Sequence, residues 1–111
     1  MNIVFQKKKS VLIVKISGDI DHHCASRIRD SVDMELLSGG IKKLVLDFSE
    51  LDFMDSSGIG VIMGRYKLVK GLGGSVYVVG AAPHINKVIQ LAGLNKLIGL
   101  CDKIDTALKA V

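Results

Sequence analysis

Two adjacent serines, Ser56 and Ser57, are the residues of this 111-residue sequence whose type and position suggest chemistry. Asp55 precedes them and is of the type that caps helices, and apolar residues recur at helical spacing after them. We therefore expect both serines on the first turn of a helix, where free backbone N–H groups favour a phosphate. A serine there can be a nucleophile, a phosphate acceptor or an ordinary first-turn residue, and spacing alone favours the last.

Hydrolytic chemistry has little support around these serines. A serine hydrolase needs a base beside its nucleophile and a strained turn flanked by glycines. Met54 stands where the first of those glycines would be, and His22 and His23 form no recognisable triad with the serines. We expect no catalytic residue and no enzymatic activity.

The glycines after the serines do not predict a nucleotide site. Gly58, Gly60 and Gly64 resemble a dinucleotide fingerprint, but one residue too many separates the last two. The sequence also lacks a phosphate-binding loop that ends in Gly-Lys-Ser/Thr. We expect instead that Gly60 and Gly64, which share one helical face, let the helix pack closely against a sheet, and we expect no cofactor.

The run 21–24, Asp-His-His-Cys, contains metal-ligating residue types in adjacent positions. Adjacent residues project in different directions on a helix, so they cannot easily surround one ion. We expect a helix cap at Asp21, partly exposed histidines and no metal. Cys24 and Cys101 lack metal or redox spacing, which favours two reduced thiols in a cytoplasmic protein.

The distribution of charge argues against nucleic acid as a partner. The formal net charge is +4, but the only basic run is 7–9, while four of the acidic residues cluster within 47–55. A phosphate backbone would be repelled by that acidic cluster. No apolar run approaches the ~20 residues of a membrane span, so we also expect no membrane insertion.

Hydrophobic patterning predicts one α/β domain over residues 1–111 with a mixed, mostly parallel sheet of four to five strands and about four helices. An N-terminal β-hairpin is expected around the lysine run. The expected strands are 3–6, 11–17, 43–48, 75–79 and a short edge strand at 97–100. The expected helices are 22–37 capped by Asp21, 56–70, 83–92, and a last helix capped by Asp102.

Two strand–helix–strand units follow from this order. Right-handed crossovers make their three strands parallel, and ligands favour the carboxyl edge of such sheets. Three loops are expected to meet at that edge, namely 18–21, 49–55 and 80–83. The acidic cluster and the serine pair therefore converge on one rim.

The stretch 52–67 strongly resembles the bacterial anti-sigma-factor antagonists of the STAS domain family. Segments 17–23, 44–47 and 92–96 support the resemblance, which covers essentially the whole chain. The extension through Gly-Arg-Tyr-Lys at 64–67 is similar to the branch that acts in sporulation.

The resemblance implies a phosphorylation switch. In that family the serine directly after the motif aspartate is phosphorylated, which corresponds to Ser56. The kinase is the anti-sigma factor itself, an ATP-dependent serine kinase, and a PP2C-type phosphatase reverses the modification. Unphosphorylated antagonist binds the anti-sigma factor and frees its sigma factor, and phosphorylated antagonist does not bind.

On this interpretation, further residues surround Ser56 on a surface that docks the partner. They are Asp21, His23, Asp55, Ser57, Gly58 and Gly60. Two alternatives remain open: a STAS scaffold or transporter-associated module, and a small nucleotide-binding or hydrolytic protein.

Overall fold

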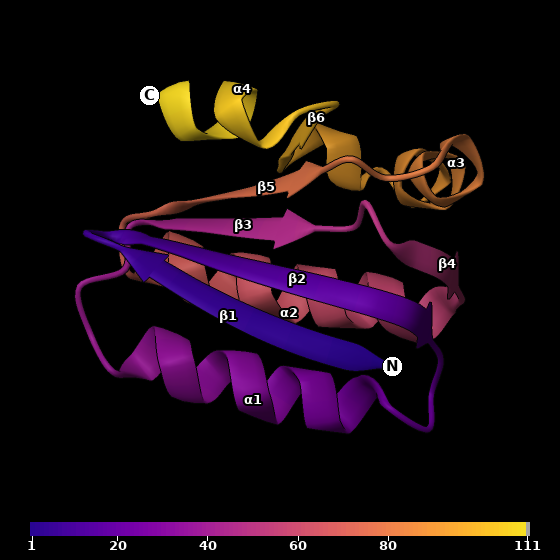
Figure 1. Ribbon diagram of the computed structural model, residues 1–111, viewed down its shortest axis with the longest axis horizontal. Coiled ribbons are helices and arrows are strands. Elements are labelled where there is room, and N and C mark those ends of the chain that lie inside the picture. Colours follow the sequence, from indigo (N-terminus) through magenta and orange to yellow (C-terminus); the bar gives the residue numbers. More distant parts are fainter. Residues whose placement is uncertain (111) are drawn as a thin grey trace.

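A mixed β-sheet organises this protein, whose computed structural model describes residues 1–110 (Figure 1). Within those residues the sheet has six strands, β1 (Asn2–Lys8), β2 (Val11–Ile20), β3 (Lys43–Asp47), β4 (Leu51–Met54), β5 (Ser75–Val79) and β6 (Gly99–Cys101). The helices are α1 (Ala25–Leu37), α2 (Ser56–Gly71), α3 (Pro83–Leu91) and α4 (Ile104–Lys109), and a 3-10 turn spans Leu94–Lys96. The expected α/β class is confirmed.

Strand order in the sheet is β1-β2-β3-β5-β6, with β4 added beside β2. Strands β1 and β2 pair antiparallel, which confirms the N-terminal hairpin, and Lys9 in its turn has a φ of 53°. Every other pairing is parallel: β2 with β3, β3 with β5, β5 with β6, and β2 with β4. The carboxyl ends of these parallel strands therefore share one edge, as the two crossovers predict.

Alternate residues of the central strands face two separate apolar clusters, because successive side chains of a strand point to opposite faces. The larger cluster joins one face of the sheet to α1, α2 and α3, and includes Leu12, Val14, Ile16, Leu44, Leu46, Val76 and Val78. The smaller cluster lies on the other face, where Ile13, Val45 and Val79 pack with Ala107 of α4. Figure 1 shows α2 running behind the sheet. The near-continuous apolar runs of β2 and β3 reflect burial on both faces.

Strand β4 was not expected, because 49–55 was interpreted as a loop. Its end residues Leu51 and Met54 are buried and the two between them, Asp52 and Phe53, are exposed, so the run has no alternating pattern and is too short for a periodic signal. It forms because β2 extends beyond β3 to Ile20 and offers free backbone groups there. The pairing of β2 with β4 has a register shift between Gly18 and Asp19.

Both helix caps expected before α1 and α4 are wrong. Helix α1 begins at Ala25 rather than His22, and its N-cap residue is Cys24, which makes no side-chain capping bond. Asp21 instead closes the turn that precedes the helix. The N-cap residue of α4 is Lys103 rather than Asp102. Neither α1 nor α4 has a side-chain cap, so tertiary packing determines where each begins.

No helix in the described part of the chain is both long and apolar enough to cross a membrane.

Candidate functional site at the start of helix α2

Backbone hydrogen bonds hold the loops together at the carboxyl edge of the sheet. The N–H of Asp55 donates to the carbonyl of Ile20 at 3.1 Å, and the N–H of Gly18 donates to the carbonyl of Glu50 at 3.2 Å. These bonds tie the segment before α2 to the end of β2. They confirm that loops 18–21 and 49–55 meet at one rim.

The third loop reaches the same rim through α3. His84, in the first turn of α3, has its Nε2 2.7 Å from the carbonyl oxygen of Asp52. The N–H of Phe48 also donates to the carbonyl of Val79 at 2.9 Å, which draws the ends of β3 and β5 together. Loop 80–83 lies between these two contacts, and a Cβ on its Gly80 would lie 3.0 Å from Cβ of Ser49, so the third expected loop also borders the rim.

Asp55 caps α2 as expected, and it forms hydrogen bonds with the second serine but not with the first. Its Oδ1 accepts the backbone N–H of Ser57 at 2.8 Å and also the Ser57 hydroxyl. Ser56 is exposed, and its hydroxyl makes no hydrogen bond with any described residue. One serine is thus engaged in the cap while its neighbour presents a free hydroxyl to solvent.

The same contacts set the charge of the cap. Hydrogen bonds from the hydroxyl and the backbone N–H of Ser57 lower the pKa of Asp55, partial desolvation opposes them, and His22 adds a smaller favourable effect. A carboxylate with a lowered pKa is charged at neutral pH. Negative charge at a helix N-terminus is favourable, so cap and dipole act together.

Gly58 lets the first turn of α2 lie directly on the core. A Cβ at this position would lie 2.1 Å from Cγ and 2.6 Å from Sδ of Met54, a side chain that is only 4% exposed. Any larger residue must displace Met54 or the helix. Gly58 is therefore fixed by packing beneath the serines, since it is buried and offers no surface to a partner.

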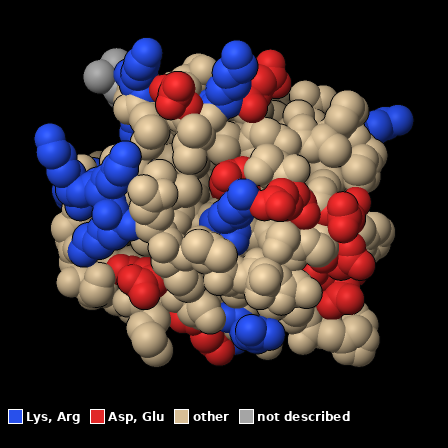
Figure 2. Space-filling view, viewed as in Figure 1, with Lys and Arg blue, Asp and Glu red and all other residues tan. Residues whose placement is uncertain are grey.

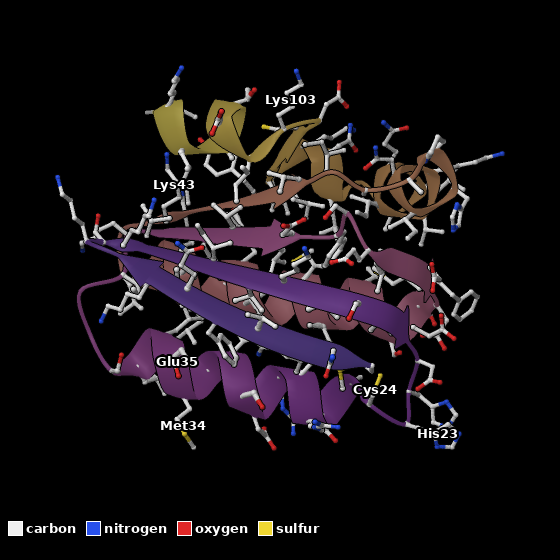
Figure 3. The ribbon with its side chains drawn as sticks, viewed as in Figure 1. His23, Cys24, Met34, Glu35, Lys43 and Lys103 are labelled. Carbon is white, nitrogen blue, oxygen red and sulfur yellow. The ribbon has the colours of Figure 1, made fainter. Side chains whose placement is uncertain are left out.

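Asp21 and His23 lie in the turn between β2 and α1. Oδ1 of Asp21 accepts the backbone N–H groups of His23 at 3.0 Å and Cys24 at 3.2 Å. Desolvation disfavours its charged form, but these bonds outweigh that effect and the pKa of Asp21 lies below its usual value. His23 is exposed and projects from the turn (Figure 3).

Gly60 and Gly64 do not lie against the sheet, and that expectation is wrong. A Cβ at either position would meet no atom within 4 Å. Both instead line an open groove between α1 and α2, because the buried positions of α2 are Gly58, Val61, Ile62, Arg65 and Val69. Gly60 is thus on the exposed side of the helix, one turn beyond the serines.

Opposite charges gather at opposite ends of the molecule (Figure 2). The acidic residues of the rim are Asp19, Asp21, Asp47, Glu50, Asp52 and Asp55. Only one of them forms a close ion pair, Glu50 with Lys15 at 2.6 Å, among the described residues. Within the same residues no three His, Cys, Asp or Glu side chains are arranged to hold a metal ion.

Sequence reasoning missed two exposed or bridging side chains of the rim. Phe53 is 48% exposed beside the acidic residues, and His84 bridges to β4. Phe53 belongs to the strand that was not recognised, and an exposed aromatic residue cannot be told from a buried one by type. His84 carried no signal because its contact is made through tertiary structure.

A small mixed sheet that begins with a hairpin, with a capped serine pair at the start of the helix after β4, defines a STAS-type domain. Residues 2–107 match the STAS domain family, so the chain belongs to that family.

Relatives and solved structures agree with this assignment. The anti-sigma F factor antagonist of Paenibacillus polymyxa is 36% identical over 97% of this chain and 92% of its own length. An anti-sigma factor antagonist from Mycobacterium paratuberculosis superposes with a TM-score of 0.89 and 27% identity, covering 99% of this chain and 92% of that one. The Bacillus cell fate determinant SpoIIAA in its phosphorylated form gives a TM-score of 0.77 at 24% identity, covering 96% of each chain.

Proposed function

We propose that this chain is an anti-sigma-factor antagonist that acts by binding and not by catalysis. In its unphosphorylated form it binds a kinase-type anti-sigma factor and frees the sigma factor, and phosphorylation of Ser56 ends that binding. The names of the relatives support the antagonist role. The sporulation pathway is the context that the Paenibacillus relative suggests, and the cytoplasm is where sigma factors work.

The observation that carries the proposal is the difference between the two serines. The hydroxyl of Ser57 is held by Asp55, whereas Ser56 is exposed with a free hydroxyl. A kinase needs an accessible hydroxyl that can rotate toward its ATP. The helix dipole at the first turn of α2 then stabilises the phosphate.

The acidic rim explains how one phosphate can act as a switch. The unmodified rim complements a basic surface on the partner. Phosphorylation adds a charge of about −1.5 to −2 and a bulky group at the centre of that surface. A penalty of about 3 kcal/mol weakens binding more than a hundredfold, which is sufficient for a switch.

We assign the docking surface to residues around Ser56. Asp21 and His23 contribute from the turn before α1, while Asp55, Ser57 and Gly60 contribute from α2. Gly58 acts from beneath, because it sets how closely the first turn lies on Met54. The partners of this surface are an ATP-dependent serine kinase, which is the anti-sigma factor, and a PP2C-type phosphatase.

The experiment that tests the proposal combines the purified chain with the host's kinase-type anti-sigma factor and Mg-ATP. Intact mass should show one added phosphoryl group, and peptide fragmentation should place it on Ser56. Ser56→Ala should abolish the modification, and Ser57→Ala should retain it. An active kinase that leaves the wild-type chain unmodified would overturn the proposal, and a phosphate on Ser57 would overturn the residue assignment.

A further inference from the structure

An open groove of about 290 Å³ lies between α1 and α2, next to the serine pair. Its walls come from Ala25, Ser26 and Arg29 of α1 and from Ser57, Gly60, Val61, Gly64 and Arg65 of α2. Gly60 and Gly64 account for the hollow, because a Cβ at either would meet nothing within 4 Å. The two helices are therefore packed together elsewhere and leave this length of their junction open.

Arg65 lines the groove with a largely buried guanidinium group. Its side chain is only 7% exposed, and its Nε lies 2.7 Å from Oδ1 of Asp33. That contact is an ion pair without hydrogen-bond alignment, and Nη1 has no hydrogen-bond partner among the described residues. Nη1 is also sealed from solvent, so a ligand in the groove would respond to the positive charge of Arg65 and would not accept a hydrogen bond from this nitrogen.

A second cation stands at the mouth of the groove. Arg29 is exposed, and within residues 1–110 it pairs only with its neighbour Asp30, at 3.0 Å from Nε to Oδ1. Such a surface pair is weak and is readily exchanged for another acceptor. Ser26 adds a hydroxyl group to the wall, whereas the hydroxyl of Ser57 already donates to Asp55. The groove thus offers donors and partial positive charge, in contrast to the acidic rim beside it.

We propose that this groove receives a carboxylate side chain, Asp or Glu, of the anti-sigma factor. This inference rests on the proposed function and extends its docking surface. Charge complementarity selects the occupant, since a guanidinium fork matches a carboxylate. Ser57 belongs both to the cap and to the groove, so one partner can cover the two together.

Two adjoining regions of opposite sign have a consequence for recognition. The acidic rim attracts basic residues of the partner, and the groove accepts an acidic one. A partner placed in the wrong orientation would bring like charges together at both regions. The groove therefore fixes the orientation in which the partner's active site reaches Ser56.

The test compares variants that fill or recharge the groove with matched controls. Gly64→Leu fills the groove, and Gly71→Leu places the same side chain on the same helix where a Cβ also meets nothing within 4 Å. Arg29→Glu reverses the charge at the mouth, and Arg27→Glu makes the same change at an exposed position of α1 outside the groove. Circular dichroism confirms that each variant is folded, and calorimetry measures its affinity for the anti-sigma factor.

We expect Gly64→Leu and Arg29→Glu to weaken binding at least tenfold and each control to stay within twofold of wild type. A double-mutant cycle of Arg29→Gln with the partner's exposed acidic residues, each changed to its amide, should find one that couples to Arg29. If the wild type binds and both groove variants bind with the same affinity, or if no partner residue couples to Arg29, the proposed role of the groove is wrong and the proposed function still stands. Absence of wild-type binding would overturn the proposed function itself.

Discussion

Oδ1 of Asp55 accepts hydrogen bonds from both donors of Ser57, the backbone N–H at 2.8 Å and the hydroxyl. The hydroxyl of the preceding Ser56 is left exposed. Two residues of the same type, adjacent in sequence, thus have different chemistry because one carboxylate selects between them. The role of the cap, Asp55, can therefore be tested separately from the role of the hydroxyl proposed to be modified, that of Ser56.

Ser56→Asp tests whether negative charge alone ends binding. A carboxylate in the first turn of α2 is compatible with the helix dipole, so thermal stability should match or slightly exceed that of wild type, by up to about 1 kcal/mol. Affinity for the anti-sigma factor should fall at least tenfold. Ser56→Asn keeps the size without the charge and should bind within a fewfold of wild type. Equal affinity of Ser56→Asp and Ser56→Asn would contradict a role for charge.

Asp55→Asn tests the charge of the cap, because asparagine can still accept the N–H of Ser57. The fold lowers the pKa of Asp55, so its carboxylate stabilises the native state above the unfolded pKa of about 3.9. That stabilisation is lost as the pH falls through the lower, folded pKa. Urea unfolding should therefore show a less stable variant at pH 7 and a difference that shrinks in acid.

Asp52→Asn is the matched control for the cap. Asp52 is exposed on the same rim, and its carboxylate makes no hydrogen bond with a described residue. Its stability should follow that of wild type over the same pH range. If the difference in unfolding free energy between Asp55→Asn and wild type stays constant down to the lowest pH, charge at the cap is not the cause of that difference.

Gly58→Ala should destabilise the fold by about 1–3 kcal/mol, as overpacking of a core does. The reason is the 2.1 Å approach of the new Cβ to Cγ of Met54. Gly60→Ala is the counterpart on the same helix with open space around its Cβ, and should gain up to about 1 kcal/mol in helix propensity. Urea denaturation of the two variants measures the difference. Similar stabilities would mean that Met54 moves aside without cost.

Lys43→Met should loosen α4 without affecting the rim. Nζ of Lys43 donates to the carbonyls of Ala107 at 2.7 Å and Ala110 at 2.6 Å, where the last helix ends (Figure 3). Loss of these charged bonds should cost about 1–3 kcal/mol. Amide hydrogen exchange in α4 should accelerate, and phosphorylation of Ser56 should be unchanged. Lys109→Met, exposed on α4, should leave exchange as in wild type.

Much of the fold could be predicted because burial on both faces leaves a plain signal. The apolar run of β2 and the helical spacing after Ser56 reflect local packing that repeats over many residues. Strand 75–79 was predicted with its observed bounds for the same reason. Glycine marked where α2 and β5 stop, and the one proline marked where α3 starts.

What could not be predicted depends on partners far apart in the chain. Strand β4 exists only because β2 is longer than β3, and no property of 51–54 records that. Asp21 and Asp102 are good capping types, yet packing starts both helices elsewhere. The orientation of Gly60 required knowing that Arg65, a charged residue, is buried while the glycines are not.

The candidate site divides in the same way. Asp55, Ser56 and Ser57 are local to one turn, and the structure places all three as the sequence predicts. Asp21 and His23 reach the rim only through the sheet. The roles of all these residues in docking stay predictions until binding is measured.

Because charge is separated between the two ends of the molecule, the net charge of the chain differs from the charge that an approaching partner experiences. Its longest dimension is 31 Å, while the electrostatic screening length at physiological salt is about 8 Å. A partner approaching the rim therefore interacts with the carboxylates there, while salt screens its interaction with the lysines of the hairpin turn at the far end. The formal net charge of +4 governs electrophoretic mobility, but a kinase that approaches Ser56 encounters the negatively charged rim.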